Sequence, residues 1–195
     1  MKTWIVVLVK DFDSAKQRLE PALEPAARRQ LAIANAERAI RAGAQVGHVL
    51  VVAGSEEAAG LGRRLGAEIL LEAEPGGQNA AAAAGVAHAT SRGAESVLLL
   101  SSDLPLVSAA ALRRVLDEAA AAGPVAVAAA ATGRGGTNAL FLRPPHALDF
   151  HFGDCSLPKF EADARARGLD FKVVDDPALA LDLDEPADLA ALNGR

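Results

Sequence analysis

Three aspartates in the chain have the chemistry and the spacing to hold a hard metal ion. Asp103 follows a buried-type apolar run, while Asp182 and Asp184 stand two residues apart near the C-terminus. Residues i and i+2 of an extended segment point to the same side, so Asp182 and Asp184 can offer both carboxylates to one cation. Oxygen ligands of this kind suit Mg²⁺. The three aspartates predict a Mg²⁺ site, unless Asp103 only forms a capping turn and Asp184 only caps a helix.

A short segment after the first apolar run concentrates positive charge. The chain has only five lysines, and Lys10 and Lys16 fall here together with Arg18. Three cations in a loop at the end of a strand form a candidate clamp for phosphate groups. Because Asp11 and Asp13 lie among them, the segment could instead be a solvated charged loop.

A pair of glycines precedes the third alanine-rich stretch. Gly76 and Gly77 would let a ligand approach the backbone and the free N–H groups at the start of a helix. The side-chain amide of Asn79, or of Gln78, could read the edge of a nucleobase through paired hydrogen bonds. The same residues could also form a plain turn followed by a helix cap.

A second glycine-containing segment resembles a site for a fixed anion. Gly153 and Ser156 precede an expected helix, whose first N–H groups and a hydroxyl favour an anion. Thr137 follows two further glycines, just before an expected strand. Cys155 lies inside the segment, and we interpret it as a packing residue because no histidine or other base stands at a partner position.

The elements that must position these residues alternate regularly. Apolar, β-branched runs predict strands at 3–9, 46–54, 68–71, 96–100, 124–130, 138–142 and 171–174. Alanine-rich stretches predict helices at 25–42, 56–65, 78–92, 108–122 and 159–167, and a last helix opens at 184–186. This alternation predicts one α/β domain over residues 1–195, with a mostly parallel sheet and helices on both faces.

In such a sheet the ligand lies beyond the carboxyl ends of the strands. The residues that follow Val9, Leu71, Leu100 and Leu142 are therefore expected to form the site.

Composition narrows the classes of function. The chain has 195 residues, 51% of them hydrophobic, and a net charge of −5. This charge argues against a protein that coats DNA or RNA, although a mononucleotide needs only a local basic cluster. A single cysteine excludes an internal disulfide, and no apolar run approaches the length of a membrane span. We expect a cytoplasmic protein, either a monomer or a homodimer, with no nucleic-acid or membrane partner.

Six segments resemble, in their order, the CofC/FbiD family of guanylyltransferases of deazaflavin coenzyme biosynthesis. They are VKDFDSAKQRL, EPGGQNAA, SSDLPLV, GGTNALFLRPP, FGDCS and LALDLDEPADL. The most specific feature is GGTNALFLRPP followed by FG-x-x-S and then D-x-D-x-P. The resemblance spans Lys10 to Leu189 and implies a three-layer, Rossmann-like fold of the MobA-like, GT-A type.

The resemblance also implies a role for each motif. By that likeness Asp103, Asp182 and Asp184 bind Mg²⁺, while Thr137, Gly153 and Ser156 hold the phosphate of a three-carbon acceptor. Lys10, Lys16 and Arg18 match the basic loop over the GTP phosphates and, with Asp103, are the expected catalytic residues. The guanosine end is expected at Gly76, Gly77 and Asn79.

The likeness implies transfer of GMP from GTP to phosphoenolpyruvate, or else to 2-phospho-L-lactate or 3-phosphoglycerate. Three further functions stay open: a molybdopterin nucleotidyltransferase, a glycosyltransferase and a non-catalytic nucleotide-binding module. The segment from Lys10 to Arg18 contains no glycine, unlike the glycine-rich first loop of the wider MobA-like group, which argues against the two transferases. Cys155 stands where the family would have a small residue, which bears on the shape of the acceptor pocket.

Overall fold

Seven strands form one mixed sheet in the computed structural model, which describes residues 2–74, 76–120, 123–133 and 135–193. The strands are β1 (Thr3–Val9), β2 (His48–Ala53), β3 (Glu68–Leu71), β4 (Ser96–Ser101), β5 (Val125–Ala130), β6 (Thr137–Arg143) and β7 (Asp170–Val174). Their order across the sheet is β3-β2-β1-β4-β6-β5-β7. All neighbouring pairs are parallel except those that β6 makes with β4 and β5. The predicted mostly parallel α/β sheet is confirmed.

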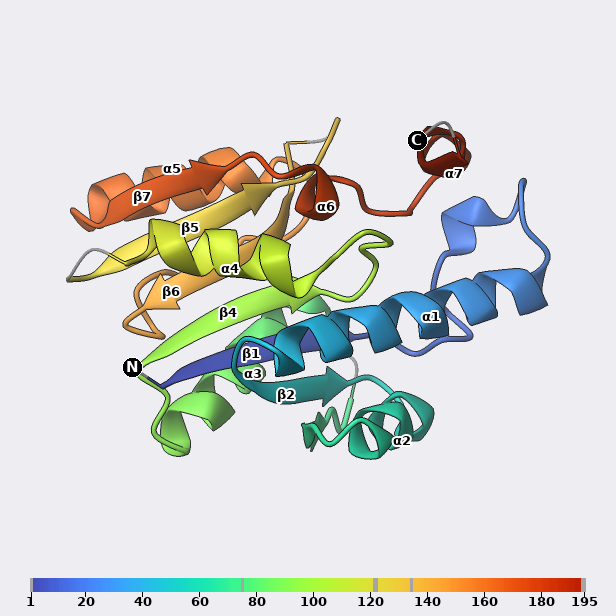
Figure 1. Ribbon diagram of the computed structural model, residues 1–195, viewed down its shortest axis with the longest axis horizontal. Helices are drawn as coiled ribbons and strands as arrows, with labels where there is room; N and C mark the ends of the chain where they lie inside the picture. Colours follow the sequence, from blue (N-terminus) through green and yellow to red (C-terminus); the bar gives the residue numbers. More distant parts are fainter. Residues whose placement is uncertain (1, 75, 121–122, 134, 194–195) are drawn as a thin grey trace.

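Helices cover both faces of the sheet (Figure 1). They are α1 (Pro25–Ala44), α2 (Glu56–Arg64), α3 (Gln78–Ser91), α4 (Ala109–Glu118), α5 (Ser156–Ala166), α6 (Pro177–Ala180) and α7 (Pro186–Asn193), with a 3₁₀ turn at Gln17–Leu19. No helix in the described ranges is both long and apolar enough to cross a membrane.

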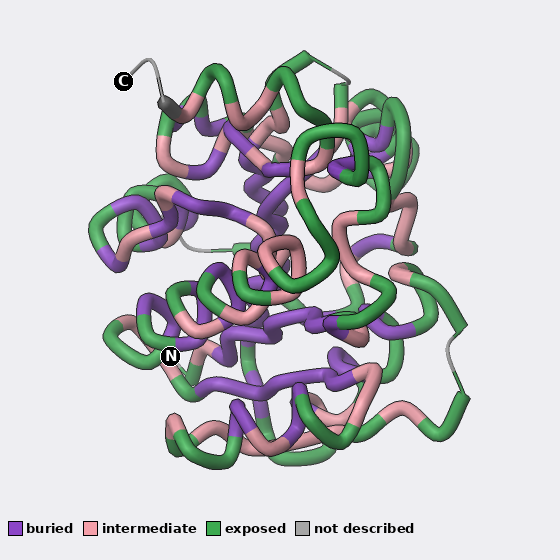
Figure 2. Tube along the Cα trace, turned by 90° about the vertical axis from the view of Figure 1, so that its right-hand side faces the viewer, coloured by how far each residue is buried: buried purple, intermediate pink, exposed green. Residues whose placement is uncertain are grey.

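Alternate residues of β1 pack into two separate hydrophobic cores. Ile5 and Val7 pack in the core that also contains buried residues of α1, α2, α4 and α6. Trp4 and Val6 pack in the other core, under α3 and α5. This period of two along a strand buried on both sides produces the three layers. In Figure 2 the buried residues follow the strands and the inner sides of the helices, and the exposed ones lie along the outer turns.

Small residues let α3 approach the sheet closely. A Cβ atom at Gly85 would lie 2.6 Å from Cγ1 of Val6 and 2.7 Å from Cγ2 of Val52. Ala81, Ala82 and Ala89 are buried on the same helix. The alanine-rich character of the helix therefore sets its distance from the strands, and with it the position of its N-terminus at the edge of the sheet.

The direction of β6 corrects one expectation. The residues after Leu142 were expected beside the site, but β6 runs antiparallel to β4 and β5, so they lie at the opposite edge of the sheet. A connection of only six residues joins β5 to β6, and antiparallel neighbours are the pairs that such short connections can join. The start of β6, Thr137, lies at the carboxyl edge of the parallel strands instead.

Candidate active site

The candidate site lies where the chain connections diverge on either side of the sheet. The connection after β1 passes through α1 on one face, whereas the connection into β4 passes through α3 on the other face. Ligands of open α/β sheets bind outside the carboxyl ends of strands at such a point. A cavity of about 570 Å³ opens there, and its walls include Lys10, Lys16, Arg18, Asp103 and Asp184. The structure thus brings together cations and carboxylates from opposite ends of the sequence.

Lys16 is the central contact of the site. Its Nζ lies 3.2 Å from Oδ2 of Asp103 and donates a hydrogen bond of 2.5 Å to the carbonyl oxygen of Leu183. The Lys16 side chain is only 6% exposed, and its backbone has a left-handed φ of 61°, a costly conformation for a residue with a side chain. The backbone N–H of Leu183 also donates to the carbonyl oxygen of Asp103, at 3.2 Å. Lys16 therefore joins the first loop, the end of β4 and the C-terminal segment.

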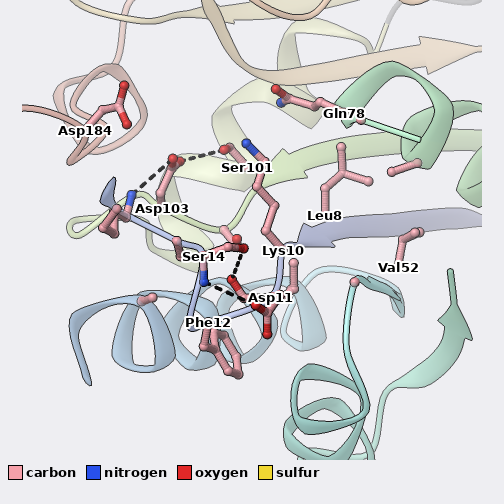
Figure 3. Close-up of a pocket in the computed structure, with 18 of the residues that line it drawn as sticks. Leu8, Lys10, Asp11, Phe12, Ser14, Val52, Gln78, Ser101, Asp103 and Asp184 are labelled. Atoms are coloured by element: carbon pink, nitrogen blue, oxygen red, sulfur yellow. Dashed lines mark hydrogen bonds and ion pairs between the residues drawn. The ribbon is translucent and has the colours of Figure 1, made fainter. Parts of the chain in front are cut away.

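Asp103 is held in its ionised form. Burial alone would raise the pKa of its carboxyl, but several neighbouring groups together more than offset that effect, the Lys16 ammonium first among them. A hydrogen bond of 2.6 Å from the Ser101 hydroxyl and the charge of Lys10 lower the pKa further. Figure 3 shows the hydrogen bond between Ser101 and Asp103. A carboxylate with a pKa below its ordinary value is present as an anionic oxygen ligand at neutral pH.

Arg18 pairs with the C-terminal segment. Its Nη1 lies 2.9 Å from Oδ2 of Asp184 and 3.8 Å from Oε1 of Glu185. With Arg18 61% exposed, these contacts hold little energy, since exposed ion pairs contribute about 0–1 kcal/mol. At the start of α7 the carboxylate of Asp188 accepts hydrogen bonds from the backbone N–H groups of Asp184 and Glu185. The carboxylate of Asp184 is directed to Arg18 instead.

Buried and half-buried residues alternate in the C-terminal segment before α7, as expected for an extended segment whose two aspartates point to the same side. Leu181 and Leu183 are buried, whereas Asp182 and Asp184 are half-buried on the other side. Asp184 lines the cavity together with Asp103, while Asp182 lies outside its lining.

The three predicted metal ligands do not form a finished cage. Within the described ranges, no group of three or more histidine, cysteine, aspartate or glutamate side chains is arranged to hold a metal ion. The physical reason at two positions is that Asp103 faces Lys16 and Asp184 faces Arg18. Their oxygen donors match the preference of Mg²⁺, so the donor chemistry fits and the metal site stays a prediction.

The residues expected to hold the acceptor phosphate lie together. The Ser156 hydroxyl donates a 3.0 Å hydrogen bond to the Thr137 hydroxyl, and both residues are buried. The loop before α5 reaches the start of β6, because the Leu157 N–H donates to the carbonyl oxygen of Gly135 at 3.0 Å. Gly153 lies in the wall of the cavity, while Thr137 and Ser156 lie outside the lining. Their role in binding phosphate stays a prediction.

The glycine-rich turn before α3 also reaches the cavity, through Gly77 and Gln78, while the neighbouring Gly76 is exposed. Asn79 makes a different contact from the expected one. Its amide accepts a 2.7 Å hydrogen bond from the Phe152 N–H and donates one of 3.2 Å to the Phe152 carbonyl oxygen. Asn79 thereby fastens the start of α3 to the loop before α5, and Gln78 presents the amide that lines the cavity.

Sequence reasoning assigned no role to four residues of the site, although it expected the residues after Leu71 and Leu100 to form part of it. Ser101 belongs to the segment SSDLPLV, but its hydrogen bond to Asp103 depends on how the chain turns after β4. Glu72 and Gly54 also line the cavity. Glu72 directly follows Leu71, one of the strand ends where the site was expected, whereas Gly54 follows the end of β2, which was not among them. The carbonyl of Leu183 left no sequence signal, because any residue supplies a carbonyl.

A family model described as "Guanylyl transferase CofC like" matches residues 3–193. The chain belongs to this family. It is 41% identical over 194 residues to a phosphoenolpyruvate guanylyltransferase of Rubrobacter xylanophilus, covering 98% of this chain and 94% of that protein. It is 36% identical to a 2-phospho-L-lactate guanylyltransferase of Methanothermobacter thermautotrophicus, covering 98% and 84%. The CofC-like chain is thus a guanylyltransferase and an enzyme.

Solved structures support the fold of this CofC-like chain. A nucleotidyl transferase from Methanothermobacter superposes with a TM-score of 0.67 at 20% identity, covering 99% of this chain and 96% of that one. A proposed nucleotide-diphospho-sugar transferase from Desulfovibrio desulfuricans G20 superposes with a TM-score of 0.79 at 16% identity, covering 98% and 87%. The expected nucleotidyltransferase fold of the MobA-like type is confirmed.

Proposed function

We propose that this enzyme transfers GMP from GTP to the phosphate of phosphoenolpyruvate, in the biosynthesis of the deazaflavin coenzyme F-420. An oxygen of the acceptor phosphate attacks the α-phosphorus of GTP, the bond from that phosphorus to the bridging oxygen of the β-phosphate breaks, and pyrophosphate leaves. The products are enolpyruvyl-diphospho-guanosine and pyrophosphate.

The observation that carries the proposal is the Lys16–Asp103 pair at the switch point of the sheet, with Lys10 in the same cavity. Cations on flexible stems suit a triphosphate whose charge distribution changes during the reaction. The cavity volume of about 570 Å³ falls in the usual range for small-molecule sites. The acceptor phosphate is already ionised near pH 7, so the chain needs to align and neutralise charges rather than supply a strong base.

Asp103 and Asp184, with Asp182 on the same extended segment, are the residues that would hold Mg²⁺. When bound, this ion supplies neutralisation of phosphate charge. The chain's own contribution is to keep Asp103 ionised and to bring the C-terminal segment next to the first loop, through the contacts of Lys16 and Arg18.

For the acceptor we propose the paired hydroxyls of Thr137 and Ser156 together with the backbone at Gly153. Hydroxyls and N–H groups at the start of a helix suit a fixed anion. Relatives bear the names of three acceptors, and one named for 3-phospho-D-glycerate, from Colwellia psychrerythraea, is 31% identical over 195 residues. Phosphoenolpyruvate is proposed because the relative at 41% identity is named for it.

A pyrophosphate-release assay with GTP and Mg²⁺, run in parallel with phosphoenolpyruvate, 2-phospho-L-lactate and 3-phosphoglycerate, tests the proposal. We expect the highest kcat/KM with phosphoenolpyruvate. The Asp103→Asn variant should release no pyrophosphate with any acceptor, because the substitution keeps the shape of the side chain but removes its anionic oxygen. A higher value with another acceptor would change the substrate assignment. Nucleotide binding without pyrophosphate release would favour a non-catalytic module. Release with none of these acceptors but with molybdopterin, supplied in a fourth parallel reaction, would favour a molybdopterin nucleotidyltransferase.

A further inference from the structure

An apolar floor extends from the sheet into one end of the cavity. Leu8 pairs with Val52, and Val52 pairs with Leu70, so these residues form a row across β1, β2 and β3. All three face the core under α3, and Leu8 and Val52 line the cavity with Ala81 of that helix. Figure 3 shows Leu8 and Val52 on neighbouring strands, with Gln78 above them. A flat, apolar ring face such as that of a nucleobase fits this floor.

A second row lies one step further toward the carboxyl edge. Strand pairing continues beyond the strand ends, because the Gly54 N–H donates to Val9 at 2.8 Å and the Glu72 N–H donates to Ala53 at 2.9 Å. By the period of two, Lys10, Gly54 and Glu72 follow the apolar row on the same face. All three line the cavity. The row therefore has a cation at one end and a carboxylate at the other.

Gly54 contributes no side chain to the middle of this row, and its backbone lies close to that of Lys10 and Asp11. A Cβ atom there would lie 3.1 Å from the backbone nitrogen of Asp11 and 3.4 Å from Cα of Lys10. Lys10 and Glu72 are two strand spacings apart, roughly 10 Å between their backbones. A nucleoside can lie across this gap with its phosphates toward Lys10 and its base toward Glu72.

Glu72 differs from the other carboxylates that face the cavity at its cationic end. Asp103 is paired with Lys16 and Asp184 with Arg18. The side chain of Glu72 is half-buried and makes no hydrogen bond or ion pair within the described ranges. An ionised carboxylate is an acceptor only, with two oxygens side by side. Its natural partner is a ligand group that presents two adjacent N–H donors.

We propose that Glu72 selects guanine, its two carboxylate oxygens accepting hydrogen bonds from N1–H and the 2-amino group. This proposal rests on the proposed function, in which GTP is the donor. Adenine presents a lone pair at N1, which would face the carboxylate oxygens and leave them without partners. Inosine lacks the 2-amino group, and xanthosine replaces it with a carbonyl oxygen. Glu72 is thus a specificity-determining residue, separate from the groups that act on the phosphates.

The test measures nucleotide affinity by titration calorimetry, with GTP, ITP, XTP and ATP and without an acceptor. For the unsubstituted enzyme we expect GTP to bind about tenfold or more tightly than each of the others, because a hydrogen bond to a charged group is lost each time. Glu72→Gln should reverse the order of GTP and XTP, since the new amide N–H can donate to the 2-carbonyl of xanthine. Glu74→Gln is the matched control, because Glu74 is exposed on the same loop and lies outside the cavity lining.

Unchanged preference for GTP over ITP and XTP in Glu72→Gln would overturn the proposal, as would equal binding of GTP and ITP by the unsubstituted enzyme. The second comparison needs no variant and so does not depend on how Glu72→Gln folds. Calorimetry also separates the two proposals. If Glu72→Gln switches the base preference but the unsubstituted enzyme releases no pyrophosphate with any acceptor, the transfer reaction is wrong and the base assignment stands.

Discussion

Lys16 makes two contacts that join distant parts of the chain. It neutralises Asp103, and it holds the C-terminal segment through the carbonyl of Leu183. A side chain only 6% exposed keeps its ammonium in place for both contacts. A triphosphate entering the cavity would offer this ammonium a stronger anionic partner, which would leave Asp103 free to bind a cation. The ion pair therefore keeps the ammonium proposed to bind phosphate beside the carboxylate proposed to bind the metal ion.

Replacing Lys16 by methionine tests its role at the phosphates. We expect Lys16→Met to lower kcat by about 10²–10³-fold, the usual effect of removing one preorganised charged donor. The KM for the acceptor should stay nearly the same, because Thr137 and Ser156 are separate from it. Steady-state kinetics with both substrates measure the two effects. Lys172→Met, on the edge strand β7, is the control, and an equal loss of kcat in that variant would contradict a specific role for Lys16.

Ser156 tests the acceptor end of the site. Ser156→Ala should raise the acceptor KM by about 10- to 150-fold, the value of one hydrogen bond to a charged group, and leave the KM for GTP nearly unchanged. Initial rates at varied acceptor and varied GTP give both constants. Ser91→Ala, at the far end of α3, should change neither. A raised KM for GTP with an unchanged acceptor KM would show that the two pockets are assigned the wrong way round.

At the scale of elements, the short helix α6 positions the segment that contains Asp182 and Asp184. Asp176 caps it by accepting a 2.9 Å hydrogen bond from the Ala178 N–H, and it also pairs with Arg114 of α4. Asn138 on β6 donates to the carbonyl oxygens of Leu179 and Ala180, at 2.8 and 3.3 Å. The sequence pattern did not predict α6, because four residues are too few to show a helical period. The aspartate pair was recognised, but the element that places it was not.

Asp176 predicts a pH-dependent stability. Burial would raise the pKa of its carboxyl, but the bonds from Arg114 and from the Ala178 N–H hold it below the ordinary value. A lowered native pKa stabilises the fold above the unfolded pKa of about 3.9, and this contribution is lost as the pH falls through the native pKa. Asp176→Asn should therefore lower the free energy of unfolding by about 1–3 kcal/mol at pH 7. Urea titrations at pH 7 and pH 3 should show that difference shrinking on acidification, and a constant difference would contradict the argument.

At the scale of the molecule, the succession of strands along the chain could be predicted because a strand buried on both faces has a continuous apolar run. The direction of β6 could not, because an apolar run is the same read in either direction. The residues of the site likewise divide into those that the sequence could predict and those that it could not. Lys10, Lys16 and Asp103 follow parallel strands and were found, whereas the contact of Asn79 with Phe152 joins residues 73 apart and left no local signal. Contacts between distant loops are decided by tertiary packing.

Because the site is built from segments far apart in the sequence, a bound nucleotide should stabilise the fold of the whole chain. The proposed GTP site draws on the first loop, the turn before α3 and the end of β4, with the C-terminal segment held beside the N-terminal loop at the same end of the molecule (Figure 1). A ligand bound only by the folded state at 100 times its Kd adds about 2.7 kcal/mol. In a chain of this length that corresponds to a rise of roughly 5–10 °C in Tm. Thermal melts with Mg²⁺ should show this rise with GTP and a much smaller one with ATP, CTP or UTP. Gly54→Val should abolish the rise, because a Cβ atom there would lie 3.1 Å from the backbone nitrogen of Asp11 and would displace the first loop. Gly60→Ala, where a Cβ atom would make only an ordinary van der Waals contact, is the control that should keep the GTP effect, and an equal rise with ATP would contradict guanine selection by the cavity.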